Sequence, residues 1–351
     1  MRLPGHHDNA NTRFTPLLLG NLISMSQTLV NSQISPLSQF ALIKASGADA
    51  ISFLQSQLTN DIKSLAENHA CLAGYCSPKG RLLATMLIWK IDDTITMEVP
   101  TELQENLQKR LQMYVMRAKV KLEHVSTTET ILGVLGISAA EKLSAWFPTL
   151  PASPYQVVNN DYGTLIRVTD GDGMARYQCI VSNALAQQIE SAAGSAANSA
   201  TEAKSDWALS EIHAGIPQVT AATLEKFVPQ MINYELIGGV NFKKGCYPGQ
   251  EIVARTHYLG KQKRRTVLAR IDSVRVASGM EVFAASGVPP DLEQPCGMVV
   301  NAALNNLGGS DCLIEIKTAC LTDTAVQLSS GETFHWLPMP YPLPADAELS
   351  T

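Results

Sequence analysis

A change of pattern near residue 265 is the feature of this sequence that most limits what it can fold into. Before that point, strand-like apolar runs alternate singly with helix-like stretches, whereas the rest of the chain is strand-rich and punctuated by glycine and proline. Strands interleaved with helices are typical of α+β layers, and a short strand-rich end favours a small antiparallel barrel or sandwich. The sequence therefore predicts an α+β fold that ends in an antiparallel β-barrel.

Two elements of the first part are predicted in detail. Apolar runs at residues 82–91 and 94–99 flank Asp92-Asp93, which indicates a β-hairpin. The sequence Thr101-Glu102-Leu103-Gln104 has the form of a capping box, and leucines then recur every fourth residue. This spacing predicts an amphipathic helix that ends near Met116.

Segments without such patterns set the expected boundaries. Residues 1–35 are rich in Asn, Ser, Gln and Pro and are expected to form a poorly ordered leader. Residues 190–206 contain nothing apolar larger than alanine, so we interpret them as a mobile loop. We expect an α+β module of two interleaved subdomains over residues 36–260, and a small β-barrel with an extended tail over residues 261–351.

The composition excludes several classes of protein. A net charge of -5 and a pI of about 5.8 give no broad electrostatic reason to bind nucleic acid, so RNA contact would need a local basic patch. The cysteines are scattered, with no C-x-x-C pair and no His at metal-ligand spacing, which indicates reduced thiols and no metal site. No signal-peptide pattern or membrane-length apolar run is present. We expect a monomeric, cytoplasmic protein.

The most distinctive stretch is Lys243-Lys244-Gly245-Cys246-Tyr247-Pro248-Gly249-Gln250-Glu251. Its glycines and its proline favour a tight turn with exposed backbone N–H groups. Cys246 lies between two lysines and a predicted helix start at Gln250, and both features favour the thiolate, which attacks electrophiles or binds metal. The alternative is a turn that joins two domains and holds a half-buried cysteine. The residues alone leave both interpretations open.

A helix is predicted before this stretch. Asp206-Trp207-Ala208-Leu209 opens it with an acidic cap, and Gly215 and Pro217 end it. His213 lies on its apolar face, while Trp207 and Glu211 are one turn apart on a neighbouring face.

The run Lys-Gly-Cys-Tyr-Pro-Gly-Gln-Glu at residues 244–251 resembles the signature of the YgfZ family, whose mitochondrial counterparts serve iron–sulfur protein maturation. The similarity extends to residues 53–61, to Pro78-Lys79-Gly80-Arg81 and to residues 207–217. The long motif is specific, whereas each shorter one is weak by itself. The family is similar in fold to the aminomethyltransferase of glycine cleavage, in which three domains surround a central hole that holds tetrahydrofolate. The resemblance therefore implies a multi-domain ring with ferredoxin-like α+β layers.

The resemblance also implies a set of site residues. Trp207 is expected to line the hole and to stack on the folate ring system, because a flat indole suits a pterin. Phe40 aligns with a second aromatic contact, usually Trp, and keeps a stacking face without the N–H donor. Cys246 is the implied reactive thiol and Lys244 the implied catalytic residue beside it. The other implied cofactor contacts are Glu211, His213, Tyr247, Gln250 and Arg255.

Two positions depart from the relatives. True aminomethyltransferases carry an aspartate that activates the folate nitrogen, and the corresponding positions here are Ala84 and Thr85. Without that carboxylate aminomethyl transfer should be badly impaired, a loss that the YgfZ branch shares. His213 stands where relatives often have Glu, so pterin recognition is expected to be weaker or differently oriented. Trp207 and His213 also fit a plain role as packed helix residues.

A basic cluster follows the motif and has three interpretations. It holds the glutamate tail of a folate, contacts a protein or RNA partner, or forms a solvated strand end. Its members are Arg255, Lys261, Lys263, Arg264 and Arg265.

These features favour a folate-dependent accessory factor for iron–sulfur enzymes, with an indirect effect on tRNA modification. Its partners would be folate and iron–sulfur proteins or their assembly factors. The alternative is a tetrahydrofolate-dependent one-carbon transferase with Cys246 as a covalent carrier. A thiol hydrolase is a third hypothesis, for which His257 is the only base near the motif.

Overall fold

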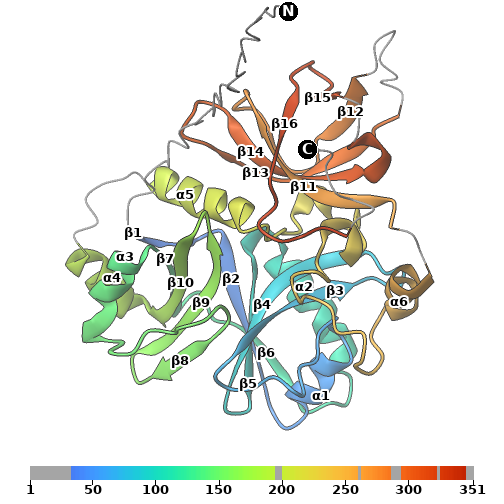
Figure 1. Ribbon diagram of the computed structural model, residues 1–351. Helices are drawn as coiled ribbons and strands as arrows, with labels where there is room; N and C mark the ends of the chain where they lie inside the picture. The colour runs from blue at the N-terminus through green and yellow to red at the C-terminus, as the bar shows by residue number, and fades with distance from the viewer. Residues whose placement is uncertain (1–32, 194–199, 260–261, 286–293, 322–324, 345–351) are drawn as a thin grey trace, which may run out of the picture.

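The computed structural model describes residues 33–193, 200–259, 262–285, 294–321 and 325–344. Three β-sheets form three lobes, with one helix lying where the lobes meet (Figure 1). The predicted α+β fold with a C-terminal antiparallel barrel is confirmed. Within these residues, no helix has the length and apolar character that a membrane crossing requires.

The first sheet takes its strands from two separate parts of the chain. Its order is β1-β7-β10-β9-β8, with antiparallel pairing. Helices α3 (Ile137–Glu141) and α4 (Asn183–Ala192) and the 3-10 helix η1 (Lys142–Ala145) cover one face of it with an apolar cluster. Its strands are β1 (Gln33–Pro36), β7 (Glu129–Leu135), β8 (Val157–Asn160), β9 (Gly163–Gly171) and β10 (Met174–Ser182).

The second sheet lies between β1 and β7 in the sequence, so the two sheets are interleaved. Its order is β3-β4-β5-β2-β6, also with antiparallel pairing. The predicted hairpin is β4 and β5, and the predicted leucine stripe is buried on α2 (Thr101–Val115); the short helix α1 (Ala50–Gln55) packs nearby. Its strands are β2 (Phe40–Ser46), β3 (Ala70–Cys76), β4 (Leu82–Ile91), β5 (Thr94–Pro100) and β6 (Lys121–His124).

The third sheet curls into a nearly closed barrel with its own apolar core. Its order is β15-β12-β13-β14-β11-β16, and a bridge between Gln327 and Thr333 brings the two edge strands together. The strands are β11 (Arg264–Ile271), β12 (Glu281–Ala285), β13 (Gly297–Leu304), β14 (Ser310–Lys317), β15 (Ala325–Leu328) and β16 (Phe334–Leu337), with the 3-10 helix η4 (Thr318–Cys320) after β14.

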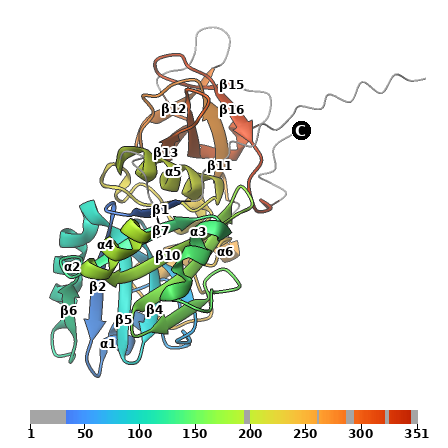
Figure 2. The ribbon, with the colours of Figure 1, turned by 90° about the vertical axis from the view of Figure 1, so that its left-hand side faces the viewer.

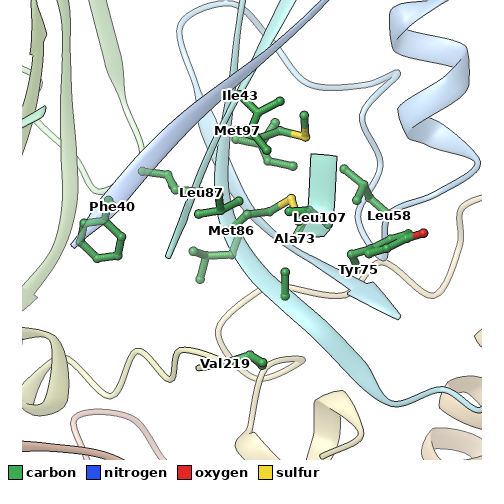
Figure 3. Packing of buried hydrophobic residues seen from close by; sticks show 14 of the residues in the cluster. Phe40, Ile43, Leu58, Ala73, Tyr75, Met86, Leu87, Met97, Leu107 and Val219 are labelled. Atoms are coloured by element: carbon green, nitrogen blue, oxygen red, sulfur yellow. The ribbon is translucent and has the colours of Figure 1, made fainter. Parts of the chain in front are cut away.

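Helix α5 (Ala200–His213) lies between the barrel and the other two sheets (Figures 1 and 2). The chain then runs through η2 (Ala221–Thr223) and η3 (Pro229–Ile232) to α6 (Gln250–Leu259), beside the second sheet. The largest apolar cluster joins this connecting segment to both sheets. Figure 3 shows part of this cluster, including Val219 from the connecting segment and Phe40 at the start of β2.

The predicted capping box at Thr101 is wrong. Pro100 is the N-cap of α2, and no side chain caps the helix. The Thr101 hydroxyl donates to the Ser38 carbonyl at 3.0 Å, and its backbone N–H donates to Gln39 at 2.9 Å. Pro100 pairs with Phe40 of β2, which places Thr101 beside residues 38 and 39. The hydroxyl and the backbone N–H that a capping box would use are therefore bonded to this neighbouring segment.

Two further predicted boundaries are also wrong. The next helix begins before Asp206, and the predicted loop at residues 190–206 is helical at both of its ends. Helix α4 continues to Ala192, and α5 already begins at Ala200; residues 194–199 lie outside the described part. Alanine has the highest helix propensity, and α4 is anchored by the buried Ile189. The predicted leader overlaps β1 at its end, and its residues 1–32 lie outside the described part. The extended tail predicted from Trp336 onward overlaps the end of β16, which runs to Leu337.

Candidate functional site

A central cavity lies where the facing sides of the first two sheets meet the end of α5. Its volume is about 40 Å³. Side chains in its wall must therefore move apart before a bicyclic ring can enter. The lining residues are Phe40, Leu72, Thr85, Met86, Leu87, Glu98, Pro100, Tyr155, Val168, Thr169, Arg176, Gln178, Glu211, Ile216, Pro217, Gln218 and Tyr234.

One wall of the cavity is a buried ion pair. The Arg176 guanidinium of β10 pairs with Glu211 of α5 and donates to the Ser210 hydroxyl at 3.2 Å, while Gln218 donates to the second Glu211 oxygen at 3.0 Å. Arg176 is fully buried, and its Nε has no partner. The sequence-predicted contact Glu211 therefore does line the cavity, with both of its oxygens already bonded.

Trp207 does not line the cavity. Its indole is 1% exposed, and the Arg176 guanidinium lies 4.7 Å from the centre of its ring, on the cavity side. The indole thus supports the arginine by a cation–π contact. A direct stack of Trp207 on a ligand would first require Arg176 to leave. Phe40, the other predicted aromatic contact, does line the cavity.

A second buried polar pair crosses the cavity from sheet to sheet. Gln178 of β10 donates through Nε2 to Oε1 of Glu98 on β5 at 2.8 Å. Burial raises the pKa of Glu98 to about 8, and the Glu211 carboxylate adds to this, while the Gln178 hydrogen bond and the Arg176 charge oppose it. Glu98 Oε2 and Gln178 Oε1 have no hydrogen-bond partner.

The sequence reasoning missed Glu98, Arg176 and Gln178. Each lies on a strand whose other residues read as ordinary core, and no motif surrounds them. A signal was present, because Arg176 and Gln178 are two residues apart and therefore share one face of a strand that is buried. A polar side chain on a buried strand face needs a partner, and here the partners come from other segments.

The distinctive motif forms a separate structure, which we call the Cys246 turn (residues 243–250). Of residues 243–255, none lines the central cavity. Cys246 is exposed and free. The helix predicted to begin at Gln250 is present as α6, and Arg255 lies exposed on it. The structure therefore does not bring the predicted contacts Tyr247, Gln250 and Arg255 to the cavity.

Lys244 holds this turn to the N-terminal part of the chain. Its ammonium donates to the carbonyls of Gln55 and Leu58 and lies 5.2 Å from the centre of the Tyr247 ring. Burial lowers the pKa of Lys244 to about 8, against the opposing charge of Asp61. Two of its hydrogen bonds go to carbonyl groups of the protein, so Lys244 positions the turn; its catalytic role stays a prediction.

The shorter motifs contact the Cys246 turn and the segment that leads into it. The Thr59 hydroxyl donates to the Gly239 carbonyl at 2.6 Å, and Asn60 donates to Gly238 at 2.8 Å. Gly249 has φ +79°, and a Cβ there would lie 2.4 Å from the Ser77 carbonyl oxygen and 2.6 Å from Gly80. The turn at residues 78–81 thus packs directly on the Cys246 turn, which explains why glycine occupies both positions.

His213 lies at the junction of three elements and outside the cavity. Its Nε2 contacts Asp311 of the barrel at 2.7 Å, and its Nδ1 contacts Asp172 in the β9–β10 turn. Burial by itself would lower the pKa of His213, but the hydrogen bonds and charges of these two aspartates raise it to about 9. Asp311 also accepts from Arg270 at 2.8 and 3.0 Å. His213 is therefore a clasp between α5 and the barrel, and the prediction of a folate contact is not supported by its position.

Two members of the predicted basic cluster, Arg264 and Arg265, are held in ion pairs. Arg264 pairs with Glu315 through two nitrogens, and the buried Arg265 pairs with Glu235. Lys263 and Arg255 are exposed, and Lys261 lies outside the described residues. Since Arg264 and Arg265 already have carboxylate partners, they are poorly placed to hold an anionic tail.

Two further observations concern the chemistry of the site. Thr85, at the position of the lost aspartate, lines the cavity and accepts a hydrogen bond from the Val219 N–H at 3.0 Å. In the described part of the chain, no three His, Cys, Asp or Glu side chains gather in a way that could hold a metal ion.

Comparisons with known proteins agree with this architecture. Residues 26–165 match the family described as GCVT N-terminal domain. The chain is 33% identical over 240 residues to the tRNA-modifying protein YgfZ of Photorhabdus laumondii, covering 68% of this chain and 70% of that one. It is 29% identical over 321 residues to the protein of the same name from Yersinia pestis, covering 88% and 92%.

A solved structure extends the comparison to the whole fold. The aminomethyltransferase T of the glycine cleavage system from Bartonella henselae superimposes with a TM-score of 0.67, covering 87% of this chain and 84% of that one. The sequence identity is 13%, so the likeness concerns the fold alone.

Proposed function

Because this chain belongs to the YgfZ family, we propose that it is a folate-binding accessory protein that supports the synthesis or repair of iron–sulfur enzymes and thereby tRNA modification. In this proposal tetrahydrofolate or a derivative occupies the central cavity, and Cys246 is the reactive residue. Its partners are iron–sulfur proteins or their assembly factors, in the cytoplasm. The tRNA link comes from the names of the relatives.

The observation that carries the folate part is the central cavity with its unsatisfied polar atoms. Glu98 Oε2, Gln178 Oε1 and Arg176 Nε are buried in its wall without partners, although buried polar groups in proteins are nearly always bonded. The ring of Phe40 forms an aromatic face in the same wall. A flat heterocycle with hydrogen-bonding edges, such as a pterin, fits both features.

The residues that would hold the folate follow from this geometry. Phe40 would contact the ring face, and Glu98 and Gln178 would face a polar edge. Arg176 is kept in the wall by Glu211 beneath it and by Trp207 behind it. A folate supplies a one-carbon unit or a redox-active ring when bound, and the chain's own residues bind and orient it.

The exposed Cys246 supports the second part of the proposal. It stands on a turn that Lys244 ties to the carbonyls of Gln55 and Leu58 and that packs through Gly249 on the turn between β3 and β4. A thiol on a fixed, exposed turn is open to a protein partner, whereas the cavity accepts only a small molecule. The one-carbon transferase alternative gains no support at Thr85, because β4 carries no carboxylate and the Thr85 hydroxyl is already bonded.

A titration with 5-formyltetrahydrofolate, followed by tryptophan fluorescence, tests the folate part. We expect saturable quenching, because Trp207 lies directly behind Arg176 in the cavity wall. Phe40→Leu keeps apolar bulk but removes the ring, and it should weaken binding by about 0.5–1.5 kcal/mol. Phe147→Leu is the matched control, since Phe147 is fully buried in the apolar cluster under α3 and α4. The absence of folate binding in the wild-type protein would overturn the proposal.

A further inference from the structure

One hydrogen bond joins the two sheets across the central cavity, and it leaves two acceptors unused. It runs from Gln178 Nε2 to Glu98 Oε1, and the two side chains belong to residues that are 3% and 5% exposed. The other oxygen of each, Gln178 Oε1 and Glu98 Oε2, has no partner. Both residues line the cavity. Two acceptor atoms thus lie on side chains that already touch, in a wall that a ligand would meet.

A purely structural role does not account for this pair. An apolar pair of similar size would join the sheets without leaving polar atoms unmet. Burial of a carboxyl group and an amide with one oxygen each unbonded costs free energy, and here both oxygens belong to touching side chains in the wall of one cavity. The missing partners are therefore expected to come with the ligand.

We infer that Glu98 and Gln178 together read the polar edge of the ligand in this cavity, and that this edge carries two adjacent N–H donors. The inference rests on the proposed function and deepens it. The amide oxygen of Gln178 and the ionised carboxylate of Glu98 only accept hydrogen bonds, so the matching groups of the ligand must donate. A 2-amino-4-oxopyrimidine ring, the polar half of a pterin, offers a ring N–H beside an amino group. Phe40, in the same cavity wall, offers a face for such a ring.

Binding of this edge should release a proton. In the free protein burial raises the pKa of Glu98 to about 8, so its carboxyl group is mostly protonated near pH 7. A ligand N–H at Oε2, added to the Gln178 N–H at Oε1, favours the ionised carboxylate, and the displaced proton passes to the solvent. The other charged groups of the cavity, Arg176 and Glu211, are paired with each other. Tyr155 and Tyr234 stay neutral, because burial raises the pKa of both.

Calorimetry on the full-length protein tests this. 5-Formyltetrahydrofolate is titrated near pH 7 in two buffers of different ionisation enthalpy, which gives the number of protons released. We expect close to one proton per ligand. Below the pKa of Glu98, the affinity should increase about tenfold for each unit by which the pH is raised. Tight binding without proton release, and with an affinity independent of pH, would overturn the inference and leave the proposed function standing. No binding at all would overturn both.

Variants sharpen the test. Glu98→Gln cannot ionise, so binding to it should release no proton and show no pH dependence from this group. An analogue with a methyl group in place of the 2-amino group should bind the wild type about tenfold or more weakly, a penalty that should shrink in Glu98→Gln. Glu129→Gln is the matched control, since Glu129 also has a buried, unpartnered Oε2 but lies outside the cavity. An unchanged analogue penalty in Glu98→Gln would contradict the inference. Proton release by the wild type decides the matter even if that variant does not fold.

Discussion

The central cavity and the Cys246 turn are built in opposite ways. The cavity buries charged and polar side chains from both sheets and α5, and several of their atoms lack partners. In the turn, the ammonium of Lys244 donates to two carbonyl groups, and Cys246 is exposed to solvent. Buried polar atoms without hydrogen-bond partners suit a small ligand that supplies those bonds. An exposed thiol on a rigid turn suits a macromolecular partner. Ligand binding therefore probes the cavity, whereas stability and complementation measurements probe the turn.

The largest effect is expected at the frame of the Cys246 turn. Gly249→Ala would place a Cβ 2.4 Å from the Ser77 carbonyl oxygen, at φ +79°, where backbone atoms cannot move aside cheaply. We expect the free energy of unfolding to fall by about 3 kcal/mol. Urea denaturation measures it. Gly245→Ala in the same turn is the control, because a Cβ there meets no atom within 4 Å. Equal stability of the two variants would show that the turn is not held as described.

A smaller effect, dependent on pH, is expected at the clasp between α5 and the barrel. The pKa of His213 is raised to about 9 in the folded state, so its ionic contribution is complete below the unfolded value of about 6.5 and is lost as pH rises through 9. His213→Gln should therefore lower the free energy of unfolding by about 2 kcal/mol near pH 6 and by much less near pH 10. Urea denaturation of both proteins at the two pH values measures this difference. A difference that does not change with pH would mean that His213 is neutral in the fold.

The smallest effect on stability is expected at Cys246 itself. Cys246 is exposed, so Cys246→Ser should change the free energy of unfolding by no more than about 0.5 kcal/mol. We nevertheless expect the serine variant to fail to restore iron–sulfur enzyme activity in a strain that lacks the protein, because serine does not supply a thiolate. Cys320→Ser, a change at a half-buried cysteine of the barrel, is the control. Full restoration by Cys246→Ser would remove the thiol from the functional residues.

Local patterns predicted the frame of this molecule well. The hairpin of β4 and β5, the leucine stripe of α2, the start of α6 and the barrel all follow from periodicity and from turn residues. The helix starts were less predictable, since the pairing of Pro100 with β2 decided where α2 begins. A local capping signal is worth about 1 kcal/mol, which a sheet contact easily exceeds.

The site was predictable only where it is local. The residues of the Cys246 turn stand together in the sequence, and the turn exists as a unit. Phe40 and Glu211 were identified through a resemblance and do reach the cavity. Trp207 and His213 were identified in the same way. In the structure, Trp207 packs against Arg176, and His213 contacts Asp172 and Asp311 instead of the cavity.

The sequence by itself determined the main strands and helices apart from their ends, and that a glycine-rich turn carries a cysteine beside two lysines. These are short-range properties, because backbone conformation and periodicity depend on residues a few positions apart. Only the tertiary structure decided that Glu98 meets Gln178 across 80 positions, and that Lys244 serves carbonyls 186 and 189 positions away. The pKa of Glu98 and the role of Lys244 follow from burial and from partners on other elements. Both are properties of the packed chain, since burial in a low dielectric exists only once distant segments have come together.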